Sequence, residues 1–269
     1  MTEAKVAAFK QHYGPVALIT GASSGIGRAF AEILAAAGLD LVVVARRRDR
    51  LDELATRLQQ QHGVAVTVCE CDLASPSAVR VILEATQHLD IGLVISNAGF
   101  GYKGAFDNGD PHMMSEMLMV NCHTPMLLAR GLLPKLRARS IDGQGRGGII
   151  FTSSVEGLIG CPYSTTYAAT KAFVVSMGEG LWGELTPEGI DVLTLCPGAT
   201  DTEAASLQGI DPSTLQNVMA PEDVARLALE NIHNGPTYIP SEHYQKSFAH
   251  LLGLPRRDAL QMMARSMKK

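Results

Sequence analysis

Short apolar runs alternate with amphipathic stretches along most of this chain, and that alternation limits the possible folds more than any other feature. Residues 16–20 read Val-Ala-Leu-Ile-Thr, and apolar side chains then recur at helical spacing over 26–37. The runs are continuously apolar, as in strands that are buried on both faces of a parallel sheet. Further runs of strand length follow at 41–45, 64–68, 91–96, 148–153 and 190–196, with a short one at 237–239.

Helices are expected between these strands. Helical spacing predicts them over 51–58, 112–137 and 163–185, and Ser75-Pro76 predicts a helix start, because serine favours the N-cap and proline the first helical position. Parallel strands joined by right-handed helical crossovers form a doubly wound sheet. The predicted fold class is therefore α/β: a single Rossmann-type parallel sheet of about seven strands with helices on both faces.

The same pattern predicts one domain spanning residues 1–269, because no linker, repeat or low-complexity segment interrupts it. The polar, glycine-rich stretch at 140–148 is expected to be a surface loop. Residues 241–269 carry apolar side chains at helical spacing, broken near Gly253, and are expected to form a helical tail.

Composition and charge exclude several classes of function. The 269 residues contain 23 Lys and Arg against 27 Asp and Glu, a net charge of −4, so binding to nucleic acid or to an anionic membrane is not expected. The N-terminus lacks the apolar core of a signal peptide, and no apolar stretch of about 18 residues occurs. We therefore expect a cytoplasmic protein whose five cysteines are free thiols. Cys69 and Cys71 are interpreted as apolar strand residues, and no metal site is expected.

A glycine-rich turn lies directly between the first predicted strand and the first predicted helix. Its glycines permit a tight turn and allow a pyrophosphate to approach backbone N–H groups at the helix N-terminus. A plain turn is the alternative, and the position in a strand–helix unit favours dinucleotide binding. The residues expected to contact the cofactor here are Gly21, Ser23, Ser24, Gly25, Ile26 and Gly27.

Basic residues follow the second strand, where an NAD-binding protein usually has a carboxylate for the ribose hydroxyls. The sequence here is Ala45-Arg46-Arg47-Arg48. A guanidinium can bind a 2′-phosphate through two hydrogen bonds, so Arg46 and Arg47, with Ser23 nearby, predict NADP (NADPH) as the cofactor. The alternative is a solvated basic helix start.

Tyr167 and Lys171 are spaced i, i+4 and share one face of a predicted helix. An ammonium near a phenol favours the phenolate, so Lys171 is expected to lower the pKa of Tyr167 and make it an acid/base group near neutral pH. The spacing alone also fits an exposed pair. However, the pair follows Ser154 at the end of the fifth strand, and the carboxyl ends of such strands face the ligand crevice.

Taken in order, these motifs resemble the single-domain short-chain dehydrogenase/reductase family over nearly the whole chain. Within the family the sequence is similar to bacterial hydroxysteroid dehydrogenases and to 3-oxoacyl and ketone reductases. It departs from the usual pattern at Ser96, where the family often has asparagine, and in a lengthened interval from Asn121 to Ser154. The motifs that carry the resemblance are Thr20 to Gly27, Asp72-Leu73, Asn97-Ala98-Gly99, Asn121, Ser153-Ser154, Tyr167 with Lys171, and Pro197-Gly198 with Thr200 and Thr202.

The resemblance implies roles for the cofactor-binding motifs. Asp72, followed by Leu73, is similar to the residue that accepts a hydrogen bond from adenine. The segment Asn97-Ala98-Gly99 is similar to the one that packs along the cofactor. The nicotinamide amide would be held by Pro197, Gly198, Thr200 and Thr202.

The resemblance also implies the reaction, a hydride transfer between the nicotinamide and a ketone or secondary alcohol. Two catalytic hydroxyls would contact the oxygen of the substrate. Tyr167 would protonate the developing alkoxide, and Ser154 would hold it by a hydrogen bond. Lys171 would hold the nicotinamide ribose, and Asn121 would steady a water-linked proton path to Lys171. The substrate is expected to be a small hydrophobic carbonyl or alcohol compound, under a lid at about 200–215.

Several interpretations stay open on sequence alone. A non-catalytic NADP-binding regulatory protein and a nucleotide-sugar epimerase or dehydratase are the rival functions. Glu156 could contact substrate or be a solvated carboxylate, and Cys161 could line the pocket or be a packed thiol. The family pairs subunits through its two long helices, so a homodimer or homotetramer is expected.

Overall fold

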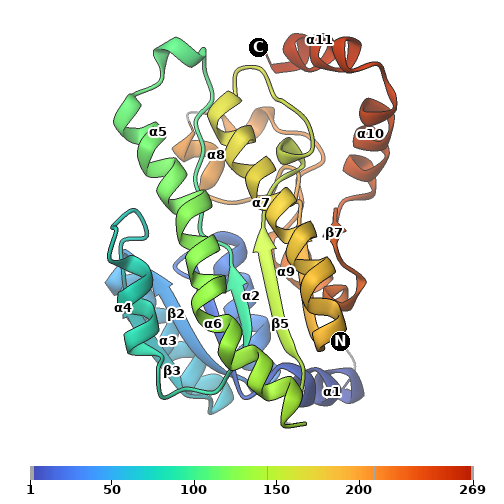
Figure 1. Cartoon of the computed structure of the whole chain (residues 1–269). Coiled ribbons are helices and arrows are strands. Elements are labelled where there is room, and N and C mark those ends of the chain that lie inside the picture. The colour runs from blue at the N-terminus through green and yellow to red at the C-terminus, as the bar shows by residue number, and fades with distance from the viewer. Residues whose placement is uncertain (1–2, 144, 209, 268–269) are drawn as a thin grey trace.

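The computed structural model describes residues 3–143, 145–208 and 210–267, and within them seven strands form one sheet (Figure 1). The strand order is β3-β2-β1-β4-β5-β6-β7, and every neighbouring pair is parallel. The order reverses between β1 and β4, which makes a crevice at the carboxyl ends of these strands. The strands are β1 (Val16–Thr20), β2 (Asp40–Ala45), β3 (Val66–Glu70), β4 (Ile91–Ser96), β5 (Gly147–Thr152), β6 (Ile190–Leu195) and β7 (Thr237–Tyr238).

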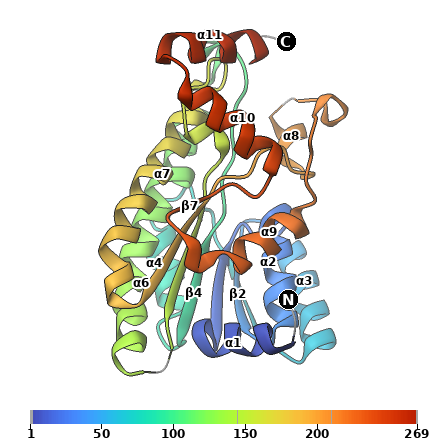
Figure 2. The same ribbon diagram turned by 90° about the vertical axis from the view of Figure 1, so that its right-hand side faces the viewer.

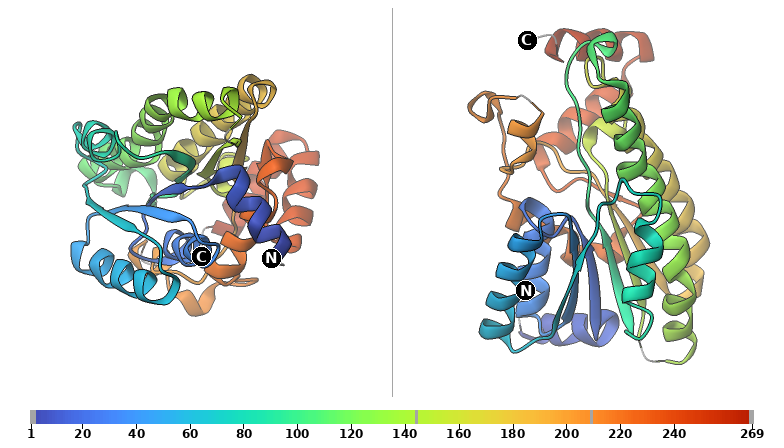
Figure 3. Two further views of the ribbon diagram at one scale, coloured as in Figure 1. Left: turned by 90° about the horizontal axis from the view of Figure 1, so that it is seen from below. Right: turned by 90° about the vertical axis from the view of Figure 1, so that its left-hand side faces the viewer.

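Helices cover both faces of this sheet, as Figures 2 and 3 show, so the predicted fold class is confirmed. Residues of α2, α3 and α9 share one apolar core with the sheet, and residues of α4, α6 and α7 share another. The helices are α1 (Glu3–Tyr13), α2 (Gly25–Ala36), α3 (Arg48–His62), α4 (Ala78–Ala85), α5 (Pro111–Leu118), α6 (Thr124–Ile141), α7 (Thr165–Leu185), α8 (Ala204–Leu207), α9 (Pro221–Glu230), α10 (Glu242–Gly253) and α11 (Arg256–Met267).

The two cores explain why the strands are apolar without alternation. Successive side chains of a strand point to opposite faces, so Ala17 and Ile19 pack on the α2 side of β1 while Val16 and Leu18 pack on the α6 side. All four side chains are buried. Full burial of a Leu or Ile side chain stabilises the fold by about 1.5–3 kcal/mol, so a polar residue in either row would be strongly unfavourable.

Several element boundaries differ from the sequence-based expectation, and two of them have a clear physical cause. Helix α4 begins at Ala78 rather than at Ser75, because Ser75 forms a turn in which its carbonyl accepts from Ala78 N and its Oγ accepts from Ser77 N. The third strand begins at Val66, two residues late, because Gly63 ends α3 in the left-handed region and Val64 packs into the core before the ladder starts.

The surface loop expected at 140–148 is shorter than predicted. Helix α6 continues to Ile141 and β5 already begins at Gly147. Gln144 of this loop and Gly209 of the predicted lid lie outside the described residues, as do the chain ends.

The C-terminal tail folds over the carboxyl end of the sheet. Phe248 and Leu251 of α10 and Ala259 of α11 share a third apolar cluster with Val155 and Cys161, residues of the segment that follows β5. The tail therefore lies beside the crevice rather than beside the sheet. No helix in the described ranges has the length and hydropathy needed to cross a membrane.

Candidate functional site

The predicted site residues gather where β1, β4, β5 and β6 end. Asn97 follows β4, Ser154 follows β5 and Pro197 follows β6, all at the same edge of the parallel sheet. Backbone hydrogen bonds join these strand ends, since Val155 N donates to Pro197 O over 3.1 Å and Ser153 N donates to Leu195 O over 2.7 Å. The residues therefore share one rigid platform.

The glycine-rich turn is fixed to the end of β4 through Thr20. Its Oγ1 accepts from the backbone N–H groups of Asn97 and Ala98, at 3.0 and 3.1 Å, and its carbonyl accepts from Asn97 Nδ2 at 3.2 Å. Gly21 has φ +70°, and a Cβ on Gly27 would lie 2.3 Å from Gly21 O. The turn thus leaves no room for side chains and keeps its backbone open to a ligand.

The first turn of α2 keeps its N–H groups free of side-chain caps. Ser24 occupies the N-cap position but its side chain does not cap the helix; its Oγ accepts from Arg47 Nη2 instead, over 2.6 Å. Free N–H groups at a helix N-terminus form an anion-binding site. This turn therefore fits the pyrophosphate of a dinucleotide.

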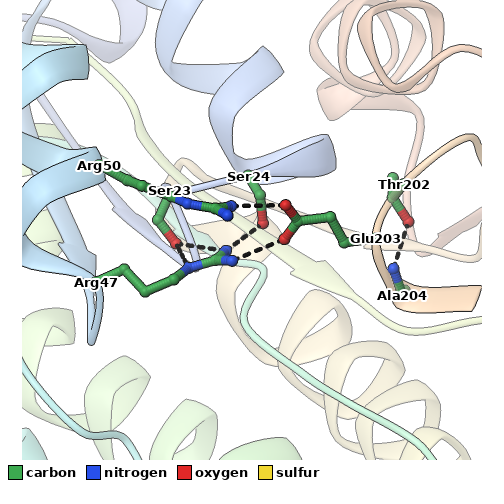
Figure 4. A network of polar contacts seen from close by, with 7 residues as sticks. All are labelled: Ser23, Ser24, Arg47, Arg50, Thr202, Glu203 and Ala204. Carbon is green, nitrogen blue, oxygen red and sulfur yellow. Dashed lines mark hydrogen bonds and ion pairs between the residues drawn. The ribbon is translucent and has the colours of Figure 1, made fainter. Parts of the chain in front are cut away.

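An anion-binding cluster lies beside this turn (Figure 4). Arg47 donates from Nε and Nη2 to Ser23 Oγ, at 3.2 and 3.0 Å, and from Nη1 to Glu203 Oε2 at 2.7 Å. Arg50 donates to Glu203 Oε1 over 2.6 Å. Hydrogen bonds from Arg47 and then Arg50 lower the pKa of Glu203 to about 2. Arg47 and Ser23 thus come together as expected, whereas Arg46 is exposed and outside the cluster.

Arg50 and Glu203 were missed by the sequence-based reasoning. Arg50 is one turn into α3, and Glu203 immediately precedes α8 in the predicted lid. Arg50 could have been found, because a helix that starts at Arg48 places Arg50 one turn after Arg47. That spacing brings the two guanidiniums to the same side. Nothing in the sequence connects Glu203 with either arginine.

Asp72 is exposed at the end of β3, and its Oδ1 accepts from Ala74 N over 3.1 Å. The following residue, Leu73, is buried, and its carbonyl accepts from Thr124 Oγ1 over 2.8 Å. This turn fixes the direction of the Asp72 carboxylate, and its contact with adenine stays a prediction.

Lys171 lies at the centre of the crevice and is almost completely buried. Its Nζ donates to Thr152 O over 2.8 Å, and burial lowers its pKa to about 8. A Cβ on Gly99 would lie 3.0 Å from Lys171 Nζ and 3.1 Å from Asn121 Oδ1. The predicted residues from β4, α7 and the α5–α6 junction therefore meet at one point.

Asn121 reaches this point from a π-helical turn, Met119–His123, between α5 and α6. Its Oδ1 accepts from Phe100 N at 3.2 Å, and its Nδ2 donates to Phe100 O and Thr170 Oγ1, both at 2.9 Å. The sequence predicted a long helix here but not the π-helical turn. Asn121 ties the 97–100 segment to α7, and the water-linked path to Lys171 stays a prediction.

Tyr167 lies one helical turn before Lys171, whose Nζ is 5.6 Å from the centre of the tyrosine ring. The expectation that Lys171 lowers the pKa of Tyr167 is wrong in this structure. Burial and then the charge of Glu156 raise that pKa well above its ordinary value, and a hydrogen bond with Ser154 opposes them.

Ser154 Oγ accepts from Glu156 N over 3.1 Å. Because that lone pair is occupied, the serine hydrogen is available for a further acceptor. The arrangement favours Ser154 as a donor toward an oxygen between itself and Tyr167.

Glu156 is a partly buried, hydrogen-bonded member of the site rather than a solvated carboxylate. Its side chain is 17% exposed, accepts from Ser164 Oγ over 2.5 Å and pairs with Lys103 Nζ at 3.3 Å. Cys161 is buried beside it, and burial together with the Glu156 charge raises the pKa of the thiol to about 12. Cys161 is therefore a packed, protonated thiol, and Lys103 is a residue that the sequence did not single out.

The residues after β6 form the base of the predicted lid. Thr200 Oγ1 donates to Gly198 O over 3.1 Å, and Thr202 Oγ1 accepts from Ala204 N over 3.3 Å. The predicted lid returns to its base at Met219, whose N donates to Ala199 O over 3.0 Å. A Cβ on Gly198 would overlap the ring of Tyr244, so α10 packs directly against this base.

Fold and site together define a class of protein: a doubly wound sheet with a dinucleotide-type turn at its switch point and a Ser–Tyr–Lys set beside it. The chain matches the family model for short chain dehydrogenases over residues 15–211. It is 29% identical over 253 residues to the 7beta-hydroxysteroid dehydrogenase of Clostridium sardiniense, covering 94% of this chain and 95% of the relative.

Two solved structures are similar as well. A short-chain dehydrogenase from Sphingobium yanoikuyae in complex with NADPH is 35% identical, with a TM-score of 0.81 and coverage of 93% and 95%. The bulky-bulky ketone specific alcohol dehydrogenase of Comamonas testosteroni is 33% identical, with a TM-score of 0.76 and coverage of 93% and 94%. The chain belongs to the short-chain dehydrogenase family and is an oxidoreductase acting on CH–OH groups.

Proposed function

We propose that this protein is an NADP(H)-dependent oxidoreductase that interconverts a bulky, hydrophobic ketone and its secondary alcohol. The observation that carries the proposal is the meeting of Ser154, Tyr167 and Lys171 at the same sheet edge as the glycine-rich turn and the Arg47 cluster. All three reacting side chains are present, so a non-catalytic role has no support. We further propose one cytoplasmic domain for the chain.

The residues present fit a dinucleotide. Gly21 and Gly27 leave a backbone cradle that a Cβ would fill, and the uncapped start of α2 offers N–H groups to phosphates. Arg47 and Arg50 already pair with the Glu203 carboxylate, and this supports the use of the two guanidiniums as an oxyanion site. A 2′-phosphate carries more negative charge than a carboxylate, and this supports NADP over NAD.

The bound cofactor supplies the hydride, and the protein supplies alignment and the proton. The carbonyl oxygen would accept from Ser154 Oγ and from the Tyr167 hydroxyl, and Tyr167 would give its proton to the developing alkoxide. Its raised pKa keeps Tyr167 protonated, as a donor must be. Lys171 and Asn121 would hold the nicotinamide ribose and the proton path, and Thr200 and Thr202 the nicotinamide amide.

The substrate class is inferred from the apolar cluster next to the Ser154–Tyr167 pair and from the relatives. The third apolar cluster, with Val155, Ile159 and Phe248 among its members, borders the Ser154–Tyr167 pair. Among the relatives are enzymes named for hydroxysteroids and for bulky ketones. A bulky hydrophobic ketone therefore suits the site better than a small keto-acid.

The test is the initial rate of NADPH and NADH oxidation with a panel that contains a steroid ketone, a 3-oxoacyl thioester, an alkyl aryl ketone and pyruvate. We expect turnover with bulky ketones and a preference for NADPH on the order of a hundredfold in kcat/KM, since two charge-assisted hydrogen bonds contribute about 3 kcal/mol. The preference should decrease with added salt. A preference for NADH, or no turnover across the panel, would overturn the proposal.

A further inference from the structure

The network in Figure 4 contains a carboxylate where the proposed function puts a phosphate. Glu203 Oε2 and Oε1 accept from Arg47 and Arg50 at 2.7 and 2.6 Å, so one carboxylate bridges both guanidiniums. Arg47 still donates to Ser23 and Ser24 from its other nitrogens. A further anion would therefore have to bind where Arg47 Nη1 now donates to Glu203.

Glu203 comes from the predicted lid and not from the nucleotide-binding half of the sheet. It immediately precedes α8 and follows Thr202, and its segment is closed at the base by the Met219–Ala199 hydrogen bond. The two ion pairs are therefore links between this segment and the first turn of α3. When they break, the segment loses its contact with the guanidiniums.

We propose that Glu203 is a specificity-determining residue that competes with the cofactor's 2′-phosphate for Arg47 and Arg50 and thereby couples release of the lid to the presence of that phosphate. The inference rests on the proposed use of NADP. A 2′-phosphate and the Glu203 carboxylate cannot share the two guanidiniums without like-charge repulsion, so binding of the phosphate displaces Glu203. A cofactor with a free 2′-hydroxyl leaves the carboxylate in place.

The competition does not depend on pH over the working range. Glu203 has a pKa of about 2 because Arg47 and Arg50 donate to it, so its carboxylate stays ionised near neutrality. Its side chain is 45% exposed, so Glu203→Gln removes the negative charge without disturbing the core. Asp201→Asn is the matched control, because Asp201 is exposed on the same segment and, in the described part of the chain, contacts neither guanidinium.

The experiment measures dissociation constants of NADPH, NADH and 2′-AMP by titration calorimetry. An exposed ion pair contributes about 0.2–1 kcal/mol, so loss of both pairs in Glu203→Gln should tighten NADPH and 2′-AMP about fivefold and change NADH less than twofold. Asp201→Asn should change all three less than twofold. Unchanged or weaker NADPH binding in Glu203→Gln, or equal gains for NADH, would overturn the competition.

Amide hydrogen exchange over residues 204–208 tests the coupling to the lid. 2′-AMP carries the phosphate without the nicotinamide, so in the native protein it should accelerate exchange there, and in Glu203→Gln it should have no further effect. No acceleration in the native protein would refute the coupling. A native protein that binds NADH more tightly than NADPH would contradict the proposed function itself, whereas NADPH preference with an unaltered Glu203→Gln contradicts only this inference.

Discussion

Tyrosine differs from phenylalanine by one hydroxyl, and in the proposed mechanism the Tyr167 hydroxyl donates the proton to the alkoxide. Tyr167→Phe should lower kcat for ketone reduction about 10²–10⁴-fold, the usual contribution of a positioned acid, while the dissociation constant of NADPH stays within about twofold. Stopped-flow or steady-state rates with the best ketone of the panel check this. Tyr238→Phe in β7 is the control and should keep native turnover. A Tyr167→Phe enzyme with more than about a tenth of native kcat would remove Tyr167 from the proton-transfer step.

Glu156 gives a second prediction at the scale of a residue. Its charge helps to raise the pKa of Tyr167, although Lys103 and Ser164 hold the carboxylate in place. In Glu156→Gln the charge is lost, so the pKa of Tyr167 falls. The alkaline limb on which reduction declines should therefore move to lower pH, and alcohol oxidation should reach its plateau at lower pH.

The measurement is kcat/KM against pH in both directions. Glu184→Gln, an exposed position near the other end of α7, is the control and should leave both profiles in place. Limbs that do not move in Glu156→Gln, or that move to higher pH, would show that Glu156 does not act on the Tyr167 proton.

The sequence pointed to single side chains that meet at the sheet edge, but it did not pair side chains that come from different loops. Tyr167 and Lys171 are neighbours on one helix, so their spacing alone placed them together. Lys103 and Glu156 come from different loops, and Arg50 meets Glu203 across the crevice. Such pairs depend on how loops fold over the sheet, which local patterns do not encode.

At the scale of elements, α11 gives the clearest prediction. Leu260 and Met263 of α11 pack against the third apolar cluster, and Leu260 approaches Gly160 between Ser154 and Tyr167. Deletion from Gly253 onward should raise KM for the ketone severalfold or change the subunit assembly, with little effect on NADPH affinity, because the cofactor cluster lies on α2 and α3.

Leu260→Ala tests the same contact without removing the helix. We expect a smaller increase in ketone KM than in the deletion, since the variant leaves a space next to the segment around Gly160. Met262→Ala, on the exposed face of α11, is the control and should behave as the native enzyme. An unchanged ketone KM and an unchanged mass in both the deletion and Leu260→Ala would show that α11 has no role at the crevice.

Elements were predictable where burial is continuous. Five of the six longer strands coincide with apolar runs to within one residue, because a strand covered on both faces buries the side chains of both faces. The sixth, β3, is only partly buried, and its start was predicted two residues early. The start of α4 was not predictable from Ser75-Pro76, since the serine bonds locally in a turn that competes with the helix cap. The π-helical turn at Asn121 carries no distinct composition, yet it places the asparagine in the site.

At the scale of the molecule, the side formed by α5, α6 and α7 is the surface on which we expect contact with another subunit. Helices α5 and α6 follow one another end to end through the π-helical turn, and this column lies beside α7 on one side of the molecule (Figure 1). Leu118, Met126 and Phe173 are exposed on them by 52%, 38% and 38%. Small residues are exposed on α7 as well, among them Ala169 and Ala172, and a Cβ at Gly180 or Gly183 would meet nothing within 4 Å. Small exposed residues of this kind permit close approach of a second copy.

We expect a homodimer or homotetramer whose subunits pair through α5–α6 and α7, with Phe173 inside the contact. Light scattering at micromolar concentration should give at least twice the chain mass of 28.7 kDa. Phe173→Glu puts one charge from each subunit into the apolar contact, where a buried charge without a partner is strongly unfavourable, so the mass should fall toward that of the monomer. Phe106→Glu alters a side chain that is 63% exposed outside these helices and should keep the native mass. Tyr167 and Lys171 occupy the same helix as Phe173, so the Phe173→Glu monomer should also turn over more slowly than the Phe106→Glu protein. A native protein that is monomeric would disprove the pairing outright.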